Sequence, residues 1–136
     1  MIQFYFLSIF FNVVSGYVLA MEDKEREGLI ETGPYFSLNN ETVRLVLGIL
    51  TLVSGLLKLL SSIQGDIPVI GDLLPAVLGL LVGFILVFDY YRTKTSIGSE
   101  KSELVEGIIA KNKRWLGFAA IASALLHFLF PTVLFL

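Results

Sequence analysis

Four long apolar runs make up most of this 136-residue chain and leave few folds open to it. They cover residues 2–20, 43–63, 73–91 and 115–136. Each is close to the roughly 20 residues that a helix needs to cross the hydrocarbon core of a bilayer. The runs are continuously apolar rather than alternating, which predicts helices and not the strands of a membrane barrel. We therefore expect one all-α domain over residues 1–136, a polytopic integral membrane protein with four transmembrane helices in an antiparallel bundle.

The first run also has some features of a cleaved signal peptide. Residues 18–20 weakly resemble a cleavage site, but no Lys or Arg precedes the apolar stretch, as a signal peptide would require. We therefore count the run as a span.

The composition excludes several classes of function. Hydrophobic residues make up 55% of the chain, charged residues 16%, and the mean hydropathy is +0.80, far above that of a typical soluble domain. The absence of cysteine removes disulfides, thiolate nucleophiles and thiolate-bound metals, and one histidine cannot make a histidine-rich metal site. The net charge of −2 argues against a nucleic-acid partner.

Basic residues orient the expected bundle. Nine of the ten fall in or beside two loops, residues 21–42 and 92–114: Lys24, Arg26, Arg44, Arg92, Lys94, Lys101, Lys111, Lys113 and Arg114. The positive-inside rule places both loops in the cytoplasm and both chain termini on the outer side, as in a bacterial-type inner membrane. The connection between the second and third spans carries only the acidic Asp66 and Asp72. Asp89 is expected to pair with Arg92 at a helix end.

Residues 102–113 of the second loop have a helical pattern of their own. Leu104, Val105, Ile108 and Ile109 share one face, which predicts a short amphipathic helix on the membrane surface or against the bundle. A solvated linker helix is the alternative. The aromatic residues near the ends of the spans are expected at the membrane interfaces: Tyr5, Tyr17, Tyr90, Tyr91 and Trp115.

Small and polar residues follow one side of every span at intervals of three and four. Small residues let helices pack closely in lipid, and this predicts the following packing positions: Gly48, Gly55, Gly79, Gly83, Gly117, Ala120 and Ala124. The packing could join helices of one chain or of an oligomer.

The polar members of these faces predict a pocket in the outer half of the bundle, lined by Lys58, His127, Asn12, Ser54 and Ser8. A cation within a span is costly and marks a candidate binding site. The simpler alternative is that Lys58 extends its stem to the outer headgroups and meets Asp66 or Asp72. For His127 and Asn12, the simpler alternative is a hydrogen bond between helices.

No catalytic or phosphate-binding motif is present, so we expect neither an enzyme nor a cofactor or metal. The first functional hypothesis is a small transport or channel-type protein, possessing the polar pocket and assembling as a homo-oligomer. The second is a non-catalytic accessory subunit of a larger membrane complex, which would dock through the acidic stretch 22–31 and the amphipathic segment. No acidic residue is expected deep in a span, which argues against a carboxylate-driven pump.

Overall fold

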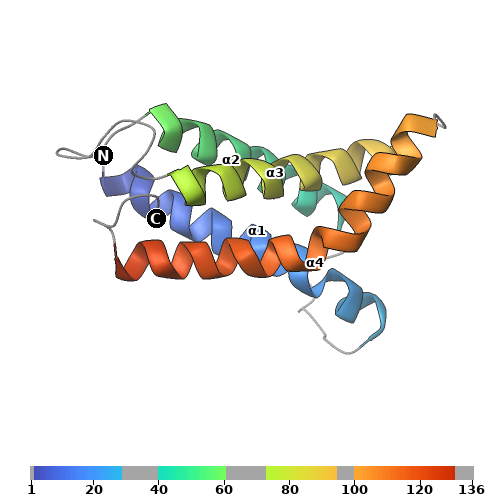
Figure 1. Ribbon diagram of the computed structural model, residues 1–136, viewed down its shortest axis with the longest axis horizontal. Helices are drawn as coiled ribbons and strands as arrows, with labels where there is room; N and C mark the ends of the chain where they lie inside the picture. The colour runs from blue at the N-terminus through green and yellow to red at the C-terminus, as the bar shows by residue number, and fades with distance from the viewer. Residues whose placement is uncertain (1, 29–39, 61–72, 95–99, 131–136) are drawn as a thin grey trace.

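The computed structural model describes residues 2–28, 40–60, 73–94 and 100–130 (Figure 1). These residues form four helices, α1 (Ile2–Arg26), α2 (Glu41–Leu60), α3 (Leu73–Lys94) and α4 (Glu100–Leu129). The prediction of an all-α fold is confirmed. The start of α2 follows from local chemistry, because the side-chain oxygen of Asn40 accepts the backbone N–H of Thr42 at 3.0 Å. Pro75 occupies the first turn of α3, where its missing N–H costs nothing.

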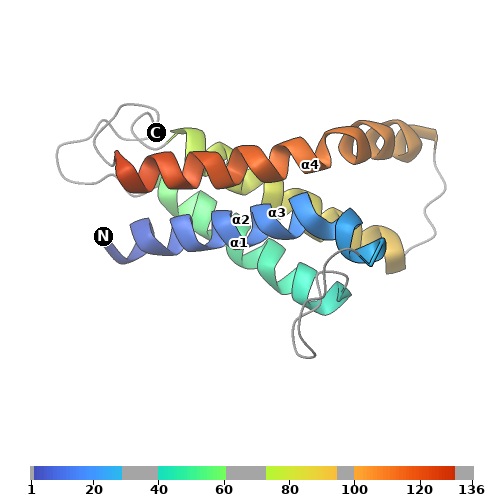
Figure 2. The same cartoon turned by 90° about the horizontal axis from the view of Figure 1, so that it is seen from below.

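The helices run up and down alternately and form two closely packed pairs. α2 packs mainly on α3, and α1 mainly on α4, so the start of α1 and the end of α4 lie at one end of the bundle (Figures 1 and 2). α1 also contacts α2 and α3, and α3 contacts α4. In the described part of the chain the backbones of α2 and α4 do not approach each other closely, and thus they lie across the diagonal.

Three of the helices are long and apolar enough to cross a membrane, over Ile2–Glu22, Glu41–Leu60 and Leu73–Lys94. Their outward faces are apolar, as on α2, where Val46, Val53 and Leu56 are about half exposed. α4 does not qualify within the described residues. Its first half carries charged side chains, and its described helix ends at Leu129, short of the predicted span end at residue 136.

Two boundaries differ from the sequence prediction. α1 continues to Arg26, so residues 21–26 are helical rather than part of the first loop. The amphipathic segment 102–113 and the fourth apolar run belong to one continuous helix, α4, whose first half turns away from the bundle axis (Figure 1). In both places a charged side chain just beyond the apolar run has partners in the bundle: Glu22 on α1 and Lys113 on α4.

Glycine allows each helix pair to approach backbone to backbone. A methyl group added at Gly117 would lie 2.6 Å from the carbonyl oxygen of Gly16, and one added at Gly16 would lie 2.7 Å from that of Gly117. The same reciprocal contact joins Gly48 of α2 and Gly83 of α3, at 3.0 and 2.8 Å. Close approach at small residues is how helices associate when no water drives them together.

An apolar layer crosses the middle of the bundle. Its buried side chains come from three helices and are Val18, Leu19, Val82, Ile85, Leu86 and Ala120. This layer separates two groups of buried polar side chains, one toward each end.

Candidate functional site

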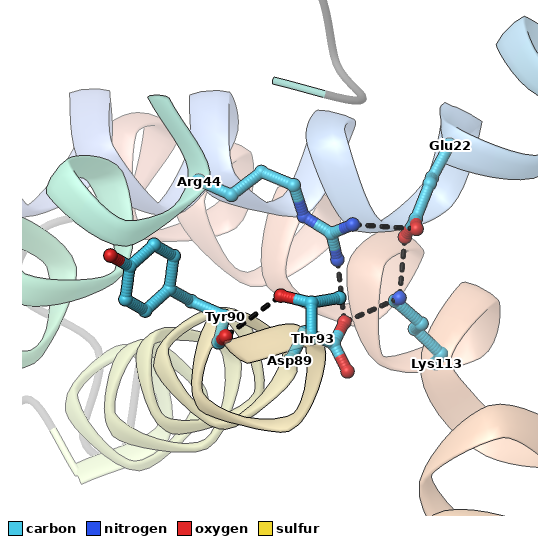
Figure 3. Close-up of polar contacts among 6 residues, drawn as sticks. All are labelled: Glu22, Arg44, Asp89, Tyr90, Thr93 and Lys113. Carbon is cyan, nitrogen blue, oxygen red and sulfur yellow. Dashed lines mark hydrogen bonds and ion pairs between the residues drawn. The ribbon is translucent and has the colours of Figure 1, made fainter. Parts of the chain in front are cut away.

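One group is a set of four charged side chains, one from each helix, which we call the charge cluster: Glu22 of α1, Arg44 of α2, Asp89 of α3 and Lys113 of α4 (Figure 3). Arg44 reaches Glu22 Oε1 through one terminal nitrogen at 2.7 Å and Asp89 Oδ2 through the other at 2.5 Å. Lys113 Nζ lies 2.6 Å from the same Asp89 oxygen and also binds Glu22 Oε2. Two carboxylates and two cations therefore alternate around a closed ring.

The charge cluster is largely withdrawn from solvent. The exposed fraction of the side chain is 2% for Glu22, 9% for Arg44, 12% for Asp89 and 17% for Lys113. Taking charges out of water is expensive, and here each charge is offset by two partners of opposite sign. Removing one partner would leave the others uncompensated, so the cluster ties all four helices together.

An open cavity of about 160 Å³ lies beside the charge cluster. Besides the four charged side chains it is lined by Arg92, Thr93, Ile109 and Ala110. The Thr93 hydroxyl donates to the carbonyl oxygen of Tyr90 at 2.8 Å (Figure 3). The cations lining the deep part of this cavity are already engaged by carboxylates, which makes the cavity a poor receptor for a further anion.

The charge cluster corrects two sequence predictions. Glu22 was expected in the first cytoplasmic loop and is instead buried at the end of a helix that could span a membrane. Asp89 was expected to pair with Arg92, but its partners are Arg44 and Lys113 on two other helices. Arg92 instead lies 3.7 Å from Glu106 of α4. Arg44 and Lys113, on neighbouring helices, reach the Asp89 carboxylate, whereas Arg92, one turn further along α3, pairs with a different carboxylate.

The second group, which we call the tyrosine cluster, consists of Tyr5, Lys58 and His127 at the opposite end of the bundle. The Lys58 ammonium lies 5.2 Å from the centre of the Tyr5 ring, and the Tyr5 and His127 rings are 4.8 Å apart. The Tyr5 hydroxyl donates to the His127 carbonyl oxygen at 2.9 Å. Lys58 is 3% exposed and His127 fully buried, so both point into the bundle. Asp66 and Asp72, the expected partners of Lys58, lie outside the described residues.

The other candidate pocket residues are also buried, between the tyrosine cluster and the apolar layer. Ser8 and Asn12 are each 1% exposed and Ser54 is 4% exposed. The Asn12 amide donates to the Pro75 carbonyl oxygen at 2.9 Å, and the Ser54 hydroxyl donates to the backbone oxygen of Thr51 at 3.0 Å. Asn12 thus has an interhelical bond, and Ser54 a bond within its own helix.

Two of the predicted packing glycines also meet these polar groups or their helices. A methyl group at Gly79 would lie 2.7 Å from the Asn12 amide oxygen, and one at Gly55 would lie 3.1 Å from the Ala76 carbonyl oxygen. Ala120 and Ala124 of α4 are fully buried. Small residues thus let α1, α2 and α3 close around the polar side chains.

Sequence reasoning assigned Tyr5 only to a membrane interface and missed it as a member of a site, whereas its side chain is 8% exposed and packs inside the bundle. A signal for it was present. The polar face of α1 runs through Ser8, Asn12 and Ser15 at intervals of four and three, and the same rhythm extended backward reaches Tyr5. Extended forward by seven residues it reaches Glu22.

In the part of the chain that the structure describes, no group of three His, Asp or Glu side chains is placed to hold a metal ion. A protein-family model matches residues 1–127, and an uncharacterized protein of Treponema pallidum (strain Nichols) is 31% identical over 136 residues, the full length of both chains. The chain belongs to this family. No solved structure matches it. The region matched by the family model contains both the charge cluster and the tyrosine cluster, so both lie within the unit that defines the family.

Proposed function

We propose that this family member is a polytopic membrane protein with four spans, α4 and the residues after it providing the fourth, and with both chain ends on the outer side. We further propose that it acts as a small transport or channel-type protein for an anionic solute. The buried polar side chains between the tyrosine cluster and the apolar layer would bind the solute, and Lys58 would provide the positive charge.

The observation that carries this proposal is the burial of Lys58. It lies within α2, a helix apolar enough to span a membrane, with 3% of its surface exposed. A charged side chain inside a span is costly and is rarely kept without a role in binding or conduction. Its ammonium lies 5.2 Å from the centre of the Tyr5 ring, whose face attracts cations.

The apolar layer fits a closed pathway. Val18, Leu19, Val82 and Leu86 are almost fully buried between the pocket and the charge cluster. In a transport cycle the side chains of this layer would have to separate to let the solute pass. The charge cluster, on the far side of the layer from the pocket, would hold the helices together while the pathway is closed.

Topology can be tested with cysteines, because the natural chain has none. Single substitutions Asn40→Cys and Glu103→Cys should react with a membrane-impermeant maleimide from one side of sealed vesicles. Asp66→Cys and Leu136→Cys should react from the other. If Leu136→Cys reacts from the side of Asn40→Cys, α4 does not complete a fourth span and the proposed topology is wrong.

Transport can be tested with purified protein in liposomes loaded in turn with chloride, nitrate and phosphate. Efflux of at least one of these anions should exceed that of empty vesicles, and Lys58→Met should abolish the excess while Lys58→Arg keeps part of it. Lys94→Met is the matched control, since Lys94 is 59% exposed. Equal efflux from all four proteins would remove Lys58 from the pathway, and no efflux of any anion would reject the anion proposal.

An accessory subunit is the second candidate, and exposed apolar side chains on the first half of α4 favour it. Leu104 and Ile108 are 71% and 64% exposed in the single chain. A stoichiometric membrane partner that co-purifies in mild detergent and covers these residues would support this function over transport.

A further inference from the structure

A line of exposed apolar and aromatic side chains follows the outward face of α4, and we call it the α4 stripe: Leu104, Ile108, Trp115 and Phe118. The intervals of four, seven and three residues place them on one side of a helix. Their exposed fractions are 71%, 64%, 73% and 37%. Ile109 and Lys113 lie on the opposite side and contact the core and Asp89. The stripe therefore points away from the bundle.

The α4 stripe extends along the bundle to the depth at which the span-like helix α3 ends, and continues beyond it. Lys113 binds Asp89, which lies near the end of α3, so Trp115 is level with the last turns of that span-like helix. Tyr91, in the same region of α3, is 63% exposed. Amphipathic rings collect at this depth, where hydrocarbon gives way to headgroups.

Arg114 adds an unengaged cation to the stripe. Its guanidinium carbon lies 5.8 Å from the centre of the Phe118 ring, and no carboxylate of the described residues lies within ion-pairing distance. Together with Trp115 and Phe118 it lines an open cavity of about 270 Å³. This differs from the cavity at the charge cluster, where Arg44 and Lys113 are bound to carboxylates.

The charges around the stripe are complementary to an anionic headgroup. Lys111 lies on the same face as Trp115, one turn earlier, and is exposed. Among the described side chains, Glu103 is the carboxylate of α4 on the same side as Arg114, but it precedes Arg114 by three turns, about 16 Å of helical rise. A planar guanidinium matches the oxygens of a phosphate, and basic side chains at a membrane surface favour anionic lipids.

We propose that Arg114, Trp115 and Phe118 bind the phosphate headgroup of an anionic phospholipid, with Leu104 and Ile108 inserted beside it into the same leaflet. This site rests on the proposed membrane placement, but not on the transport function. Arg114 contacts the phosphate, Phe118 supports the guanidinium, and Trp115 packs against the glycerol and upper acyl region.

The only tryptophan of the chain, Trp115, makes the site directly measurable. Full-length protein in liposomes of phosphatidylcholine is titrated with brominated phosphatidylglycerol or brominated phosphatidylcholine, and quenching of tryptophan fluorescence is followed. Half-quenching should need about fivefold less of the anionic lipid, the preference that one basic side chain gives at a membrane surface. Arg114→Gln should remove most of this preference and leave the helix content measured by circular dichroism unchanged.

Lys94→Gln is the control, an exposed cation on another helix, and should keep the preference. Inorganic phosphate added at the same concentration should not relieve the quenching, because the headgroup is held together with its acyl chains. Relief by free phosphate would assign the site to a soluble anion instead and overturn the proposal. Equal quenching by both lipids, or a preference that survives in Arg114→Gln, would also overturn it.

Absence of quenching by either lipid in correctly inserted protein would show that another protein or a second copy covers the stripe, and would reject the lipid site. Correct insertion is judged by the cysteine-labelling pattern of the same preparation. Failure of the labelling pattern would reject the proposed topology, whereas failure of quenching alone would reject only the lipid site.

Discussion

The two ends of the bundle bury charge in different ways. At the charge cluster, two cations and two carboxylates from four helices neutralise one another through ion pairs of 2.5–2.7 Å and the Lys113–Glu22 contact. At the tyrosine cluster, Lys58 lies against an aromatic ring, and the ring's hydroxyl is bonded to a backbone carbonyl of α4. One end is a ring of ion pairs, and at the other a buried cation lies over an aromatic ring.

This difference indicates a division of work. Removing one partner from a buried ion-pair network typically costs about 3–5 kcal/mol, whereas a cation–ring contact contributes about 0.5–2 kcal/mol. The charge cluster therefore holds the helices in place, and a bound anion would have little to gain there. We therefore place solute binding at the other end, where the buried Lys58 ammonium lies against the Tyr5 ring.

The largest effect should come from Arg44→Met, which removes from the charge cluster the guanidinium that bridges the two carboxylates. Glu22 and Asp89 would both lose the guanidinium that they share, and the free energy of unfolding should fall by about 3–5 kcal/mol. Reversible unfolding of purified protein in mixed detergent micelles, followed by circular dichroism, measures the change.

Lys94→Met is the matched control for that experiment. It breaks an ion pair of 2.9 Å with Glu41, but the two side chains are 59% and 45% exposed, so the loss of stability should be far smaller than for Arg44→Met. Equal losses for Arg44→Met and Lys94→Met would mean that the charge cluster is no more than a surface network, and the contrast between the two ends would disappear.

A smaller effect is expected from Gly117→Ala, at the contact of α1 and α4 between the two clusters. The added methyl group would meet the backbone oxygen of Gly16 at 2.6 Å, which cannot move without displacing a helix. We expect a loss of about 1–3 kcal/mol, the usual cost of overpacking, in the same unfolding measurement.

Gly107→Ala controls for the substitution itself. It lies in the same helix with open space around its would-be methyl group, so it should be neutral or stabilising by up to about 1 kcal/mol through helix propensity. If Gly117→Ala and Gly107→Ala were equally stabilising, α1 and α4 would not need a glycine at their contact. The close approach of the two helices would then not be what fixes the distance between the two clusters.

The side chains that face into the bundle could largely be predicted from the three- and four-residue spacing of small and polar residues. The polar face of α2, read from Gly48 through Thr51, Gly55 and Lys58, predicted which side chains turn inward, and all four are buried. Extending it back by one turn gives Arg44. The face of α4 through Gly117 and Ala120 extends back to Lys113 in the same way. Periodicity therefore indicates members of the charge cluster even where, as for Glu22 and Lys113, they lie just outside the predicted spans.

The pairing within the clusters could not be predicted. Which carboxylate meets Arg44 depends on the relative rotation and depth of helices that are far apart in sequence, and no spacing within one helix contains that information. Asp89 shows the limit clearly. Its sequence neighbour Arg92 was the obvious partner, but the bundle brings two cations of other helices closer. Likewise, Tyr5 could be placed on a face but not against Lys58.

The smallest effect tests the tyrosine cluster without removing its ring. Tyr5→Phe keeps the surface under Lys58 and deletes the hydroxyl that donates to the His127 carbonyl oxygen at 2.9 Å. Loss of one such hydrogen bond should lower the free energy of unfolding by about 0.5–1.5 kcal/mol. Tyr91→Phe, at a position 63% exposed, should change it by much less.

Anion efflux separates the two roles of Tyr5 in the same variant. If the ring alone supports Lys58, Tyr5→Phe should keep wild-type efflux despite its lower stability, and Tyr5→Leu should lose it. A loss of efflux in Tyr5→Phe as large as in Tyr5→Leu would mean that the hydroxyl, and not the ring, organises this end. The tyrosine cluster would then resemble the charge cluster, as a set of fixed directional bonds, and the proposed division of work between the two ends would fail.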